Sequence, residues 1–268
     1  MSDYIYDPSL EDERSRLRAL EFVLDPGTVS VLETVGVAKG WKCLEVGGGG
    51  GSVTRWLCDR VGSEGHVVAT DLSPRFLEEI DAPNLEVRKH NIVTDPLEEN
   101  AFDLVHSRDV LEHIAERELV LDRMVAALKP GGWLVAEDVD FVSALRADGF
   151  GESSSLAPFE GRMWAASVKG MKARGVDPEY GRRLPWRLAA RGLTEISATV
   201  RGGLFQAGSP GRTLALLSLA QLRPLLLEGG LSENEVELLM ATMKREDFMG
   251  FGPIHVAAWG RTPAEATV

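Results

Sequence analysis

The sequence predicts an α/β protein built on a mostly parallel sheet, with one domain in 268 residues. Three observations predict this fold class. Short β-rich segments alternate with helix-like segments over residues 41–140, which is the rhythm of strand–helix–strand units. A run of five glycines, residues 47–51, follows the first of these strands directly. Hydrophobic residues make up 44% of the chain, which is enough to bury a sizeable core.

Two helices are expected ahead of the sheet. Residues 11–24 are charged and amphipathic, and residues 26–36 open on Pro26, which favours the first turn of a helix. We therefore expect residues 1–36 to form a helical segment outside the core.

The first core strand, residues 41–46, carries an acid, Glu45, at its end, and the residues from Ser52 onward suit the opening of a helix. A strand, a glycine loop and a helix N-terminus together form a nucleotide-type pocket, the alternative being a flexible turn. Because glycine tolerates positive φ and has no Cβ, the backbone can turn and approach a ligand closely at Gly47, Gly49 and Gly51. The loop departs from the dinucleotide spacing, and no Gly-Lys-Ser/Thr of a phosphate-binding loop follows.

The second strand, residues 66–71, also ends in an acid. Asp71 lies 20 residues beyond Gly51, and a carboxylate there can accept hydrogen bonds from both hydroxyls of a ribose. Leu72 follows and is placed to pack on an adenine. The alternative is that Asp71 caps a helix that starts near Pro74.

Three further segments continue the pattern. Residues 84–92 form a third strand and its end, and residues 101–108 form a fourth strand that leads into a helix from Asp109. Residues 128–135 read Leu-Lys-Pro-Gly-Gly-Trp-Leu-Val. This is a turn into a fifth strand, in which Pro presets one turn position and Gly-Gly supplies positive φ.

In this order the segments resemble class I S-adenosylmethionine-dependent methyltransferases, and the glycine loop is similar to motif I of that family. The resemblance implies S-adenosylmethionine as the cofactor. It also implies a Rossmann-like seven-stranded sheet of order 3-2-1-4-5-7-6, with strand seven antiparallel, helices on both faces and a helical cap. Ligands bind at the carboxyl ends of the strands in such sheets, which selects two further regions, 107–109 and 137–140.

The resemblance further implies roles for single residues. Glu45 helps to fix the methionine ammonium or the glycine loop, and the Arg108 backbone carbonyl accepts from that ammonium. Asn91 stands where the family usually has an acid that meets the adenine amino group, and its amide oxygen can still accept, although a turn-forming role is the alternative. Ile92 supplies a backbone N–H to the ring. The expected cofactor set is Glu45, Gly47, Gly49, Gly51, Asp71, Leu72, Asn91, Ile92 and Arg108.

After residue 140 the strand rhythm stops. We expect residues 143–184 to be an insert that forms a cap together with residues 1–36, over a core of residues 41–140 and 185–261. The later elements expected are a short helix over 184–191, a strand over 194–201, a leucine-rich run over 214–227 broken by Pro224, a helix over 232–245 and a last strand over 255–260. Ser232 and Glu235 have the spacing of a capping box. The leucine-rich run indicates core packing or a dimer face rather than a lipid site, so a homodimer stays open.

Aromatic residues of the N-terminal segment, the insert and its surroundings are expected to line an acceptor pocket. Such pockets are mostly apolar with a few polar anchors, and ordinary cap packing is the alternative. The set is Tyr6, Phe141, Phe159, Trp164 and Phe205.

Methyl transfer mainly needs positioning, but an oxygen or nitrogen nucleophile must also lose a proton. Histidines and acids near the strand ends are the candidate bases: His106, His113, Glu137, Asp138 and Asp140. We single out His106, His113 and Asp138 as catalytic candidates. A packing or capping role is the alternative for His113.

Composition excludes several classes of protein. The chain has 29 basic and 41 acidic residues, a net charge of −12, which disfavours a nucleic-acid partner. No apolar run reaches the roughly 18 residues that span a bilayer, and the N-terminus lacks a signal-peptide pattern, so we expect a cytoplasmic protein without a membrane partner. Cys43 and Cys58 indicate buried packing thiols, and no Cys/His cluster has zinc spacing, so no metal is expected.

The function predicted is methyl transfer from S-adenosylmethionine to an oxygen, nitrogen or carbon nucleophile of a small molecule, such as a specialised metabolite or a quinone-like acceptor. Two alternatives stay open. One is a fold that retains the cofactor but catalyses a non-methylating reaction such as a cyclisation, and the other is a non-catalytic nucleotide-binding module. A NAD-dependent reductase is disfavoured by the glycine spacing.

Overall fold

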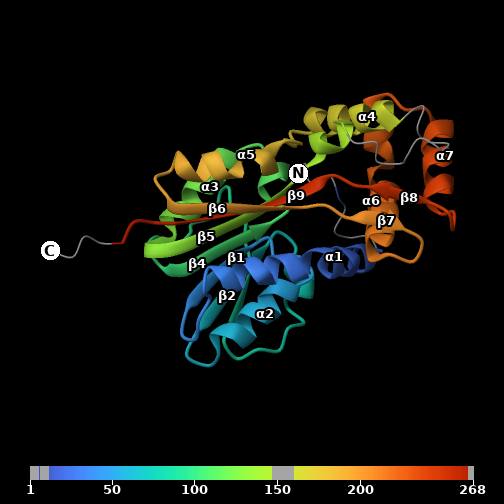
Figure 1. Cartoon of the computed structure of the whole chain (residues 1–268). Coiled ribbons are helices and arrows are strands. Elements are labelled where there is room, and N and C mark those ends of the chain that lie inside the picture. Colours follow the sequence, from blue (N-terminus) through green and yellow to red (C-terminus); the bar gives the residue numbers. More distant parts are fainter. Residues whose placement is uncertain (1–5, 7–11, 147–159, 265–268) are drawn as a thin grey trace.

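The computed structural model describes residue 6, residues 12–146 and residues 160–264. A seven-stranded sheet of order β3-β2-β1-β4-β5-β9-β6 lies at its centre (Figure 1). β9 is antiparallel to both β5 and β6, and the other neighbouring pairs are parallel. The predicted sheet is therefore confirmed, with β9 as strand seven. The strands are β1 (Lys42–Val46), β2 (His66–Asp71), β3 (Leu85–Lys89), β4 (Phe102–Arg108), β5 (Leu128–Asp140), β6 (Thr194–Arg201) and β9 (Ile254–Arg261).

The parallel strands end together at one edge of the sheet. Val46, the last residue of β1, is paired with Thr70 of β2 and with Ser107 of β4. Arg108 of β4 is in turn paired with Glu137 of β5. The loops that follow these strands consequently open on the same edge, where ligands bind in open α/β sheets.

Helices cover both faces of the sheet (Figure 1). α1 (Glu13–Thr34) and α2 (Ser52–Val61) pack on one face, and α3 (Arg117–Ala126) and α5 (Tyr180–Ala189) pack on the other. Neighbouring residues of a strand point to opposite faces, so Leu104 belongs to the first core and Val105 to the second. The predicted layers are thus present, and each face has its own hydrophobic core.

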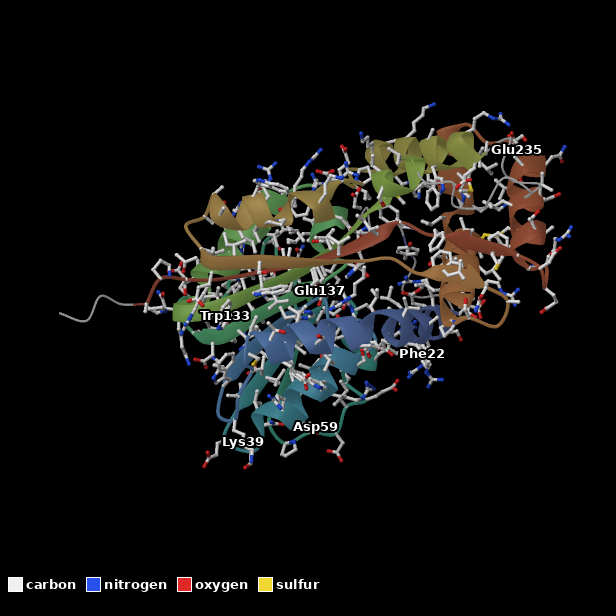
Figure 2. All side chains as sticks on the ribbon, viewed as in Figure 1. Phe22, Lys39, Asp59, Trp133, Glu137 and Glu235 are labelled. Carbon is white, nitrogen blue, oxygen red and sulfur yellow. The ribbon has the colours of Figure 1, made fainter. Side chains whose placement is uncertain are left out.

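The N-terminal segment is one helix, and the prediction of a break before Pro26 was wrong. α1 continues through Pro26 to Thr34. Proline has no N–H, so the carbonyl four residues earlier, that of Phe22, loses its helical partner. Phe22 is 69% exposed and its side chain points away from the sheet (Figure 2), so water can satisfy this carbonyl. The helix therefore tolerates the proline on its solvent side.

A second lobe forms the cap beyond the carboxyl edge of the sheet (Figure 1). In the part of the chain that the structure describes, this lobe contains three helices and a two-stranded sheet: α4 (Glu160–Ala173), α6 (Pro210–Gly229), α7 (Glu233–Met243), β7 (Leu204–Gln206) and β8 (Met249–Phe251). α4 and α6 pack so closely that a Cβ on Gly170 would lie 2.4 Å from the Leu225 carbonyl oxygen. α6 also contacts α1, where Gln221 Nε2 donates to Glu13 Oε2 at 2.9 Å.

The cap is larger than the segment 143–184 that we expected. Residues 204–251 were assigned to the core, but their helices share a hydrophobic cluster with α4. α5 begins at Tyr180, inside the expected insert, yet it packs on β5 and β9 of the core. The leucine-rich run is partly buried in the cap: Leu222, Leu225 and Leu226 are buried, and most of its other residues are partly exposed.

The ends of several other helices and strands agree with the predictions or differ from them. β6 has the predicted bounds, and the Ser232–Glu235 capping box is present at the start of α7. α6 is not broken by Pro224, because the carbonyl that it frees belongs to Ala220, an exposed residue. The helix expected from Asp109 is only a short 3-10 turn. Within the described ranges there are three such turns: η1 (Pro74–Phe76), η2 (Leu111–His113) and η3 (Phe141–Arg146).

Two smaller expectations concern the cysteines and the membrane. Cys43 and Cys58 are free and buried, and burial raises the pKa of both thiols. This agrees with packing thiols. None of the helices in the described ranges is long and apolar enough to cross a membrane.

Candidate functional site

The glycine loop between β1 and α2 is a tight turn made of bare backbone. Gly47, Gly49 and Gly51 have φ values of 72°, 54° and 87°, a region that L side chains rarely adopt. The N–H groups of Gly47 and Gly48 both donate to the Thr70 carbonyl, at 2.8 and 3.0 Å, which ties the loop to the end of β2. Residues 47–50 line a cavity at the sheet edge, while Gly51 is buried and starts α2.

Asp71 ends β2 and holds the loop from the other side. Its Oδ2 accepts from the Gly49 N–H at 3.0 Å, and its Oδ1 accepts from the Ser73 N–H at 2.8 Å. A carboxylate has about four lone-pair positions, so roughly two remain for other donors. Leu72 also lines the cavity and is 50% exposed, which leaves an apolar side chain for a flat ring.

Asn91 and Ile92 follow β3 and line the same cavity. The Asn91 Oδ1 accepts from the Val93 N–H at 3.0 Å, which is the turn-forming arrangement. An amide oxygen has a second lone pair, so this bond leaves one acceptor position. The Ile92 N–H donates to no other group within the described ranges.

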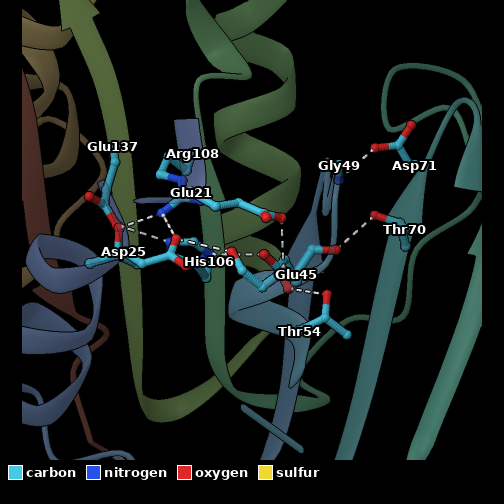
Figure 3. A network of polar contacts seen from close by, with 12 residues as sticks. Glu21, Asp25, Glu45, Gly49, Thr54, Thr70, Asp71, His106, Arg108 and Glu137 are labelled. Atoms are coloured by element: carbon cyan, nitrogen blue, oxygen red, sulfur yellow. Dashed lines mark hydrogen bonds and ion pairs between the residues drawn. The ribbon is translucent and has the colours of Figure 1, made fainter. Parts of the chain in front are cut away.

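Arg108 ends β4, and its side chain reaches α1. Its Nη1 donates to Asp25 Oδ1 at 2.9 Å and to Thr28 Oγ1 at 3.0 Å (Figure 3). The guanidinium is therefore committed to holding the helix against the sheet. Arg108 still lines the cavity, and its backbone carbonyl is the group that the resemblance assigned to the cofactor.

Glu45 lines the cavity but is only 4% exposed, and its carboxylate is already engaged. Its Oε2 accepts from Thr54 Oγ1 in the first turn of α2, and its Oε1 lies 3.8 Å from His106 Nδ1 (Figure 3). Glu45 thus links β1 to the helix that follows the loop. Of its two expected roles, this geometry favours support of the loop over contact with an ammonium.

A chain of ionisable side chains continues from Glu45 across the sheet. His106 is fully buried, and its Nε2 lies 3.1 Å from Glu137 Oε1. The second Glu137 oxygen lies 3.9 Å from His255 Nδ1. Burial opposes a charge on His106, but hydrogen bonds to the carboxylates of Glu137 and Glu45 raise its pKa. The lining that the described residues form does not include His106, so it supports the cavity from beneath.

Asp109 stands at the far end of this chain. Its φ of 54° is unusual for a residue with a side chain, and such strain often marks functional sites. It lines the cavity, and its Oδ1 lies 2.9 Å from His255 Nε2. Burial works against ionisation of Asp109, but His255 lowers its pKa, so the carboxylate is charged. Sequence reasoning placed Asp109 only within a general strand-end region, because its backbone strain carries no sequence motif.

On the opposite face of the sheet, η2 places Glu112 and His113 against Asp138. Asp138 Oδ1 accepts from the Glu112 N–H at 3.1 Å, and Glu112 Oε1 lies 3.2 Å from His113 Nε2. Burial raises the pKa of Asp138 to about 8 and that of Glu112 well above its usual value. Burial lowers the pKa of His113 to about 4. Glu112 and His113 line the cavity, whereas Asp138 is fully buried behind them.

The cavity has a volume of about 1450 Å³ and continues from the glycine loop into the cap. Of the aromatic residues singled out from the sequence, Tyr6, Phe141, Trp164 and Phe205 lie in its lining, and Phe159 lies outside the described residues. The side chains that α4, α6 and α7 contribute are all uncharged. They include residues that no motif pointed to, such as Met163, Met171, Leu219, Leu222, Leu226 and Met243.

Comparisons with known proteins agree with this architecture. A family model described as a methyltransferase domain matches residues 44–136. Methyltransferase str2 of Strobilurus tenacellus is 29% identical over 253 residues, which cover 88% of each chain. The structure is similar to phosphoethanolamine N-methyltransferase 2 of Haemonchus contortus, solved with S-adenosylhomocysteine, with 17% identity, a TM-score of 0.55 and coverage of 93% of this chain and 57% of that one. A (4+2)-cyclase, SpnF, has 17% identity, a TM-score of 0.50 and coverage of 90% and 81%.

The strand order, the glycine loop and the cavity at the carboxyl edge define an α/β enzyme that binds a nucleoside cofactor. The chain belongs to the class I S-adenosylmethionine-dependent methyltransferases, and S-adenosylmethionine is its cofactor. The residues present fit an adenosyl group, because a bare loop, a carboxylate with spare lone pairs and the N–H of Ile92 face one cavity. Among the described residues, no group of three or more His, Cys, Asp and Glu side chains could hold a metal ion.

Proposed function

We propose that this methyltransferase acts on an uncharged, largely apolar small molecule, at an oxygen, nitrogen or carbon nucleophile. One observation carries the proposal: a single cavity joins the glycine loop to a cap whose helices contribute only uncharged side chains to the lining. Arg174, directly after α4, also lines the cavity, but it is paired with Glu228 at 2.7 Å. A charged acceptor would therefore lose its hydration under the cap without gaining a free counter-charge. Methionine, leucine and aromatic side chains suit a planar or hydrocarbon-rich molecule. The similarity to methyltransferase str2 of Strobilurus tenacellus and to a short part of a highly reducing polyketide synthase supports a specialised metabolite.

The cofactor residues expected from the sequence keep their places in this proposal. Asp71 accepts from the ribose hydroxyls, Leu72 packs on the adenine, and Asn91 and Ile92 meet its polar edge. The Arg108 carbonyl accepts from the methionine ammonium, and Gly47 and Gly49 let the chain pass close to the nucleoside. Glu45 and Gly51 act from behind, since Glu45 is held by Thr54 and Gly51 starts α2.

When bound, the cofactor supplies the activated methyl group, and the protein positions the acceptor and excludes water. Two ionisable groups of the cavity lining lie next to β4 and are placed to accept a proton from an acceptor hydroxyl, namely Asp109 and His113. Asp109 is charged beside His255, and His113 is neutral at pH 7 because burial lowers its pKa to about 4. His106 and Asp138 then act as positioning residues, because both are fully buried beneath this lining.

The alternative is a non-methylating reaction in the same cavity, such as the cyclisation for which one structural neighbour is named. Both reactions use an apolar cavity next to the cofactor. They differ in one product, since only methyl transfer converts S-adenosylmethionine to S-adenosylhomocysteine.

The test is to incubate the protein with S-adenosylmethionine and a panel of uncharged phenols, hydroquinones and enolisable diketones, and to measure S-adenosylhomocysteine and the methylated product. Phosphoethanolamine serves as a charged comparison. We expect turnover with members of the uncharged panel and none with phosphoethanolamine. Turnover of the charged compound alone would overturn the acceptor class. Conversion of a panel member without S-adenosylhomocysteine would favour the non-methylating alternative.

Location and partners complete the proposal. We propose a cytoplasmic enzyme, because its two cysteines are unpaired and buried as in a reducing compartment. A net charge of −12 argues against a nucleic-acid substrate. A homodimer remains an expectation that light scattering can test.

A further inference from the structure

Glu21 of α1 lines the cavity beside the glycine loop, in a place that no sequence motif indicated. Its Oε1 accepts from the Ser52 N–H at 3.3 Å, in the first turn of α2 (Figure 3). The same oxygen would lie 2.3 Å from a Cβ on Gly50, so the carboxylate rests directly against the loop. It is half-buried. An acid therefore forms part of the wall where the loop meets α1.

The charges around Glu21 are unbalanced. Asp25, one turn further along α1, is paired with the Arg108 guanidinium at 2.9 Å and accepts from Ser52 Oγ at 3.0 Å. Arg55 donates to the Gly50 carbonyl instead of to an acid. No Lys, Arg or His nitrogen of the described chain forms an ion pair with Glu21 within 4.0 Å. Burial and the neighbouring Asp25 raise the pKa of the Glu21 carboxyl, and they outweigh the Ser52 N–H and the more distant charges of Arg108 and Arg55, which lower it.

Glu45, the acid at the end of β1, does not lack a partner in the way that Glu21 does. Its carboxylate accepts from Thr54 and lies beside His106, so its charge is already compensated. Glu21 is the acid of this wall that has a backbone N–H as its sole hydrogen-bond partner among the described residues. The methionine end of the cofactor carries an α-ammonium, a strong donor that seeks a carboxylate.

We infer that the Glu21 carboxylate is the ion-pair partner of the cofactor's α-ammonium. Three observations carry this: Glu21 faces the cavity, rests against Gly50 and has no ion-pair partner within 4.0 Å among the described residues. Asp25 and Glu45 are both committed elsewhere. The competing explanation is that Glu21 only stabilises the N-terminus of α2 through Ser52. The inference depends on the cofactor and not on the acceptor, so it stands or falls separately from the proposed function.

The experiment measures binding by calorimetry, with Glu21→Gln and three ligands that differ at the methionine end. S-Adenosylhomocysteine has the ammonium, its deamino analogue lacks only that group, and 5′-methylthioadenosine lacks the whole amino-acid part. Glu33→Gln is the matched control, because Glu33 is an exposed acid of the same helix. We expect Glu21→Gln to weaken S-adenosylhomocysteine about tenfold or more, in line with loss of a charge-assisted bond.

The pattern across ligands decides the matter. The inference requires Glu21→Gln to leave 5′-methylthioadenosine within about twofold of wild type and to remove most of the preference for S-adenosylhomocysteine over its deamino analogue. An equal loss for all three ligands would overturn it in favour of a purely structural role. Unchanged or tighter S-adenosylhomocysteine binding would also overturn it, because Glu21 would then merely occupy the helix N-terminus until the cofactor arrives. Crystals with S-adenosylhomocysteine should place the ammonium nitrogen about 2.7–2.9 Å from the Glu21 carboxylate.

Discussion

The two halves of the cavity are built by different means. The half at the sheet edge is made of backbone and carboxylates, with the glycine loop, Asp71 and Glu21 in its wall. The half under the cap is made of bulky uncharged side chains from α4, α6 and α7. Hydrogen bonds and charges are directional and recognise one group in one place, whereas apolar packing recognises volume and shape. This division suits an enzyme that shares its cofactor with a family and has an acceptor of its own.

If the comparison is right, damage to one half should leave the ligand of the other half largely unaffected. The following substitutions test this, beginning with the largest expected effect.

Gly49→Val should abolish binding of S-adenosylhomocysteine, with affinity falling by about 100-fold or more, because Gly49 holds a φ of 54° that a β-branched residue resists. The nearest protein atom to a Cβ at this position is Leu17 Cδ2 at 3.5 Å, so the protein itself can accommodate the new side chain. We expect the valine side chain to occupy the space that the cofactor needs. Calorimetry measures the loss. Gly36→Val is the control, since Gly36 has a φ of 82° and no atom within 4 Å of a Cβ. Normal binding by Gly49→Val would move the cofactor elsewhere.

Asp71→Ala should weaken S-adenosylhomocysteine by about 1–3 kcal/mol, because ribose hydroxyls and the Gly49 N–H both lose an acceptor. Calorimetric titration measures the affinity. The control is Asp59→Ala, which removes an exposed acid of α2. An affinity equal to that of the wild type would refute the ribose placement.

Gly229→Ala tests the cap half. A Cβ there would lie 2.0 Å from the Ala166 carbonyl oxygen, so α4 and α6 must separate, at a cost of about 1–3 kcal/mol. We expect acceptor turnover to fall several-fold while affinity for S-adenosylhomocysteine changes by less than about threefold. Gly161→Ala is the control, because its Cβ would meet nothing within 4 Å. Equal losses for both ligands would show that the halves are not independent.

Asp138→Asn tests the polar layer beneath the cavity and should have the smallest effect on ligand binding; its main effect is on stability. The folded-state pKa of Asp138 is about 8, above its ordinary 3.8, so its contribution to stability declines as pH rises between these values. Asparagine cannot ionise and keeps an acceptor for the Glu112 N–H, so the variant should lose less stability than wild type between about pH 5 and pH 8. Urea unfolding across that range measures the slope. Some slope will remain, because the pKa of Glu112 is also raised. Parallel curves for the two proteins would contradict the prediction.

The same division separates what could be predicted from the sequence from what could not. The sheet half depends on local signals, such as alternating apolar residues, turn glycines and acids at strand ends. Its strand order, which the family resemblance implied and local patterning alone could not give, was confirmed, and β6 has the predicted bounds. The cap half depends on helices that meet far along the chain, as Gly170 of α4 meets Leu225 of α6. No local pattern marks such a meeting, so residues 204–251 were assigned to the core.

The prolines and the strained residue Asp109 show further features that could not be predicted from the sequence. Pro26 and Pro224 were both treated as helix boundaries, but the carbonyls that they free belong to exposed residues, and the helices continue. Asp109 and Glu21 lie in the cavity for reasons of backbone geometry and helix placement, which sequence spacing does not encode. Local rules thus predicted the glycine loop and the strand-end residues that line the cavity, but they did not single out Asp109 and Glu21.

α1 touches both ligand regions at once. Glu21 lies against the glycine loop, and eight positions earlier along the same helix Glu13 accepts from Gln221 of the cap helix α6. A shift of α1 at one ligand region therefore also moves its contacts at the other. If both ligands favour the same small shift of α1, thermodynamic linkage requires each of them to change the affinity of the other by the same factor.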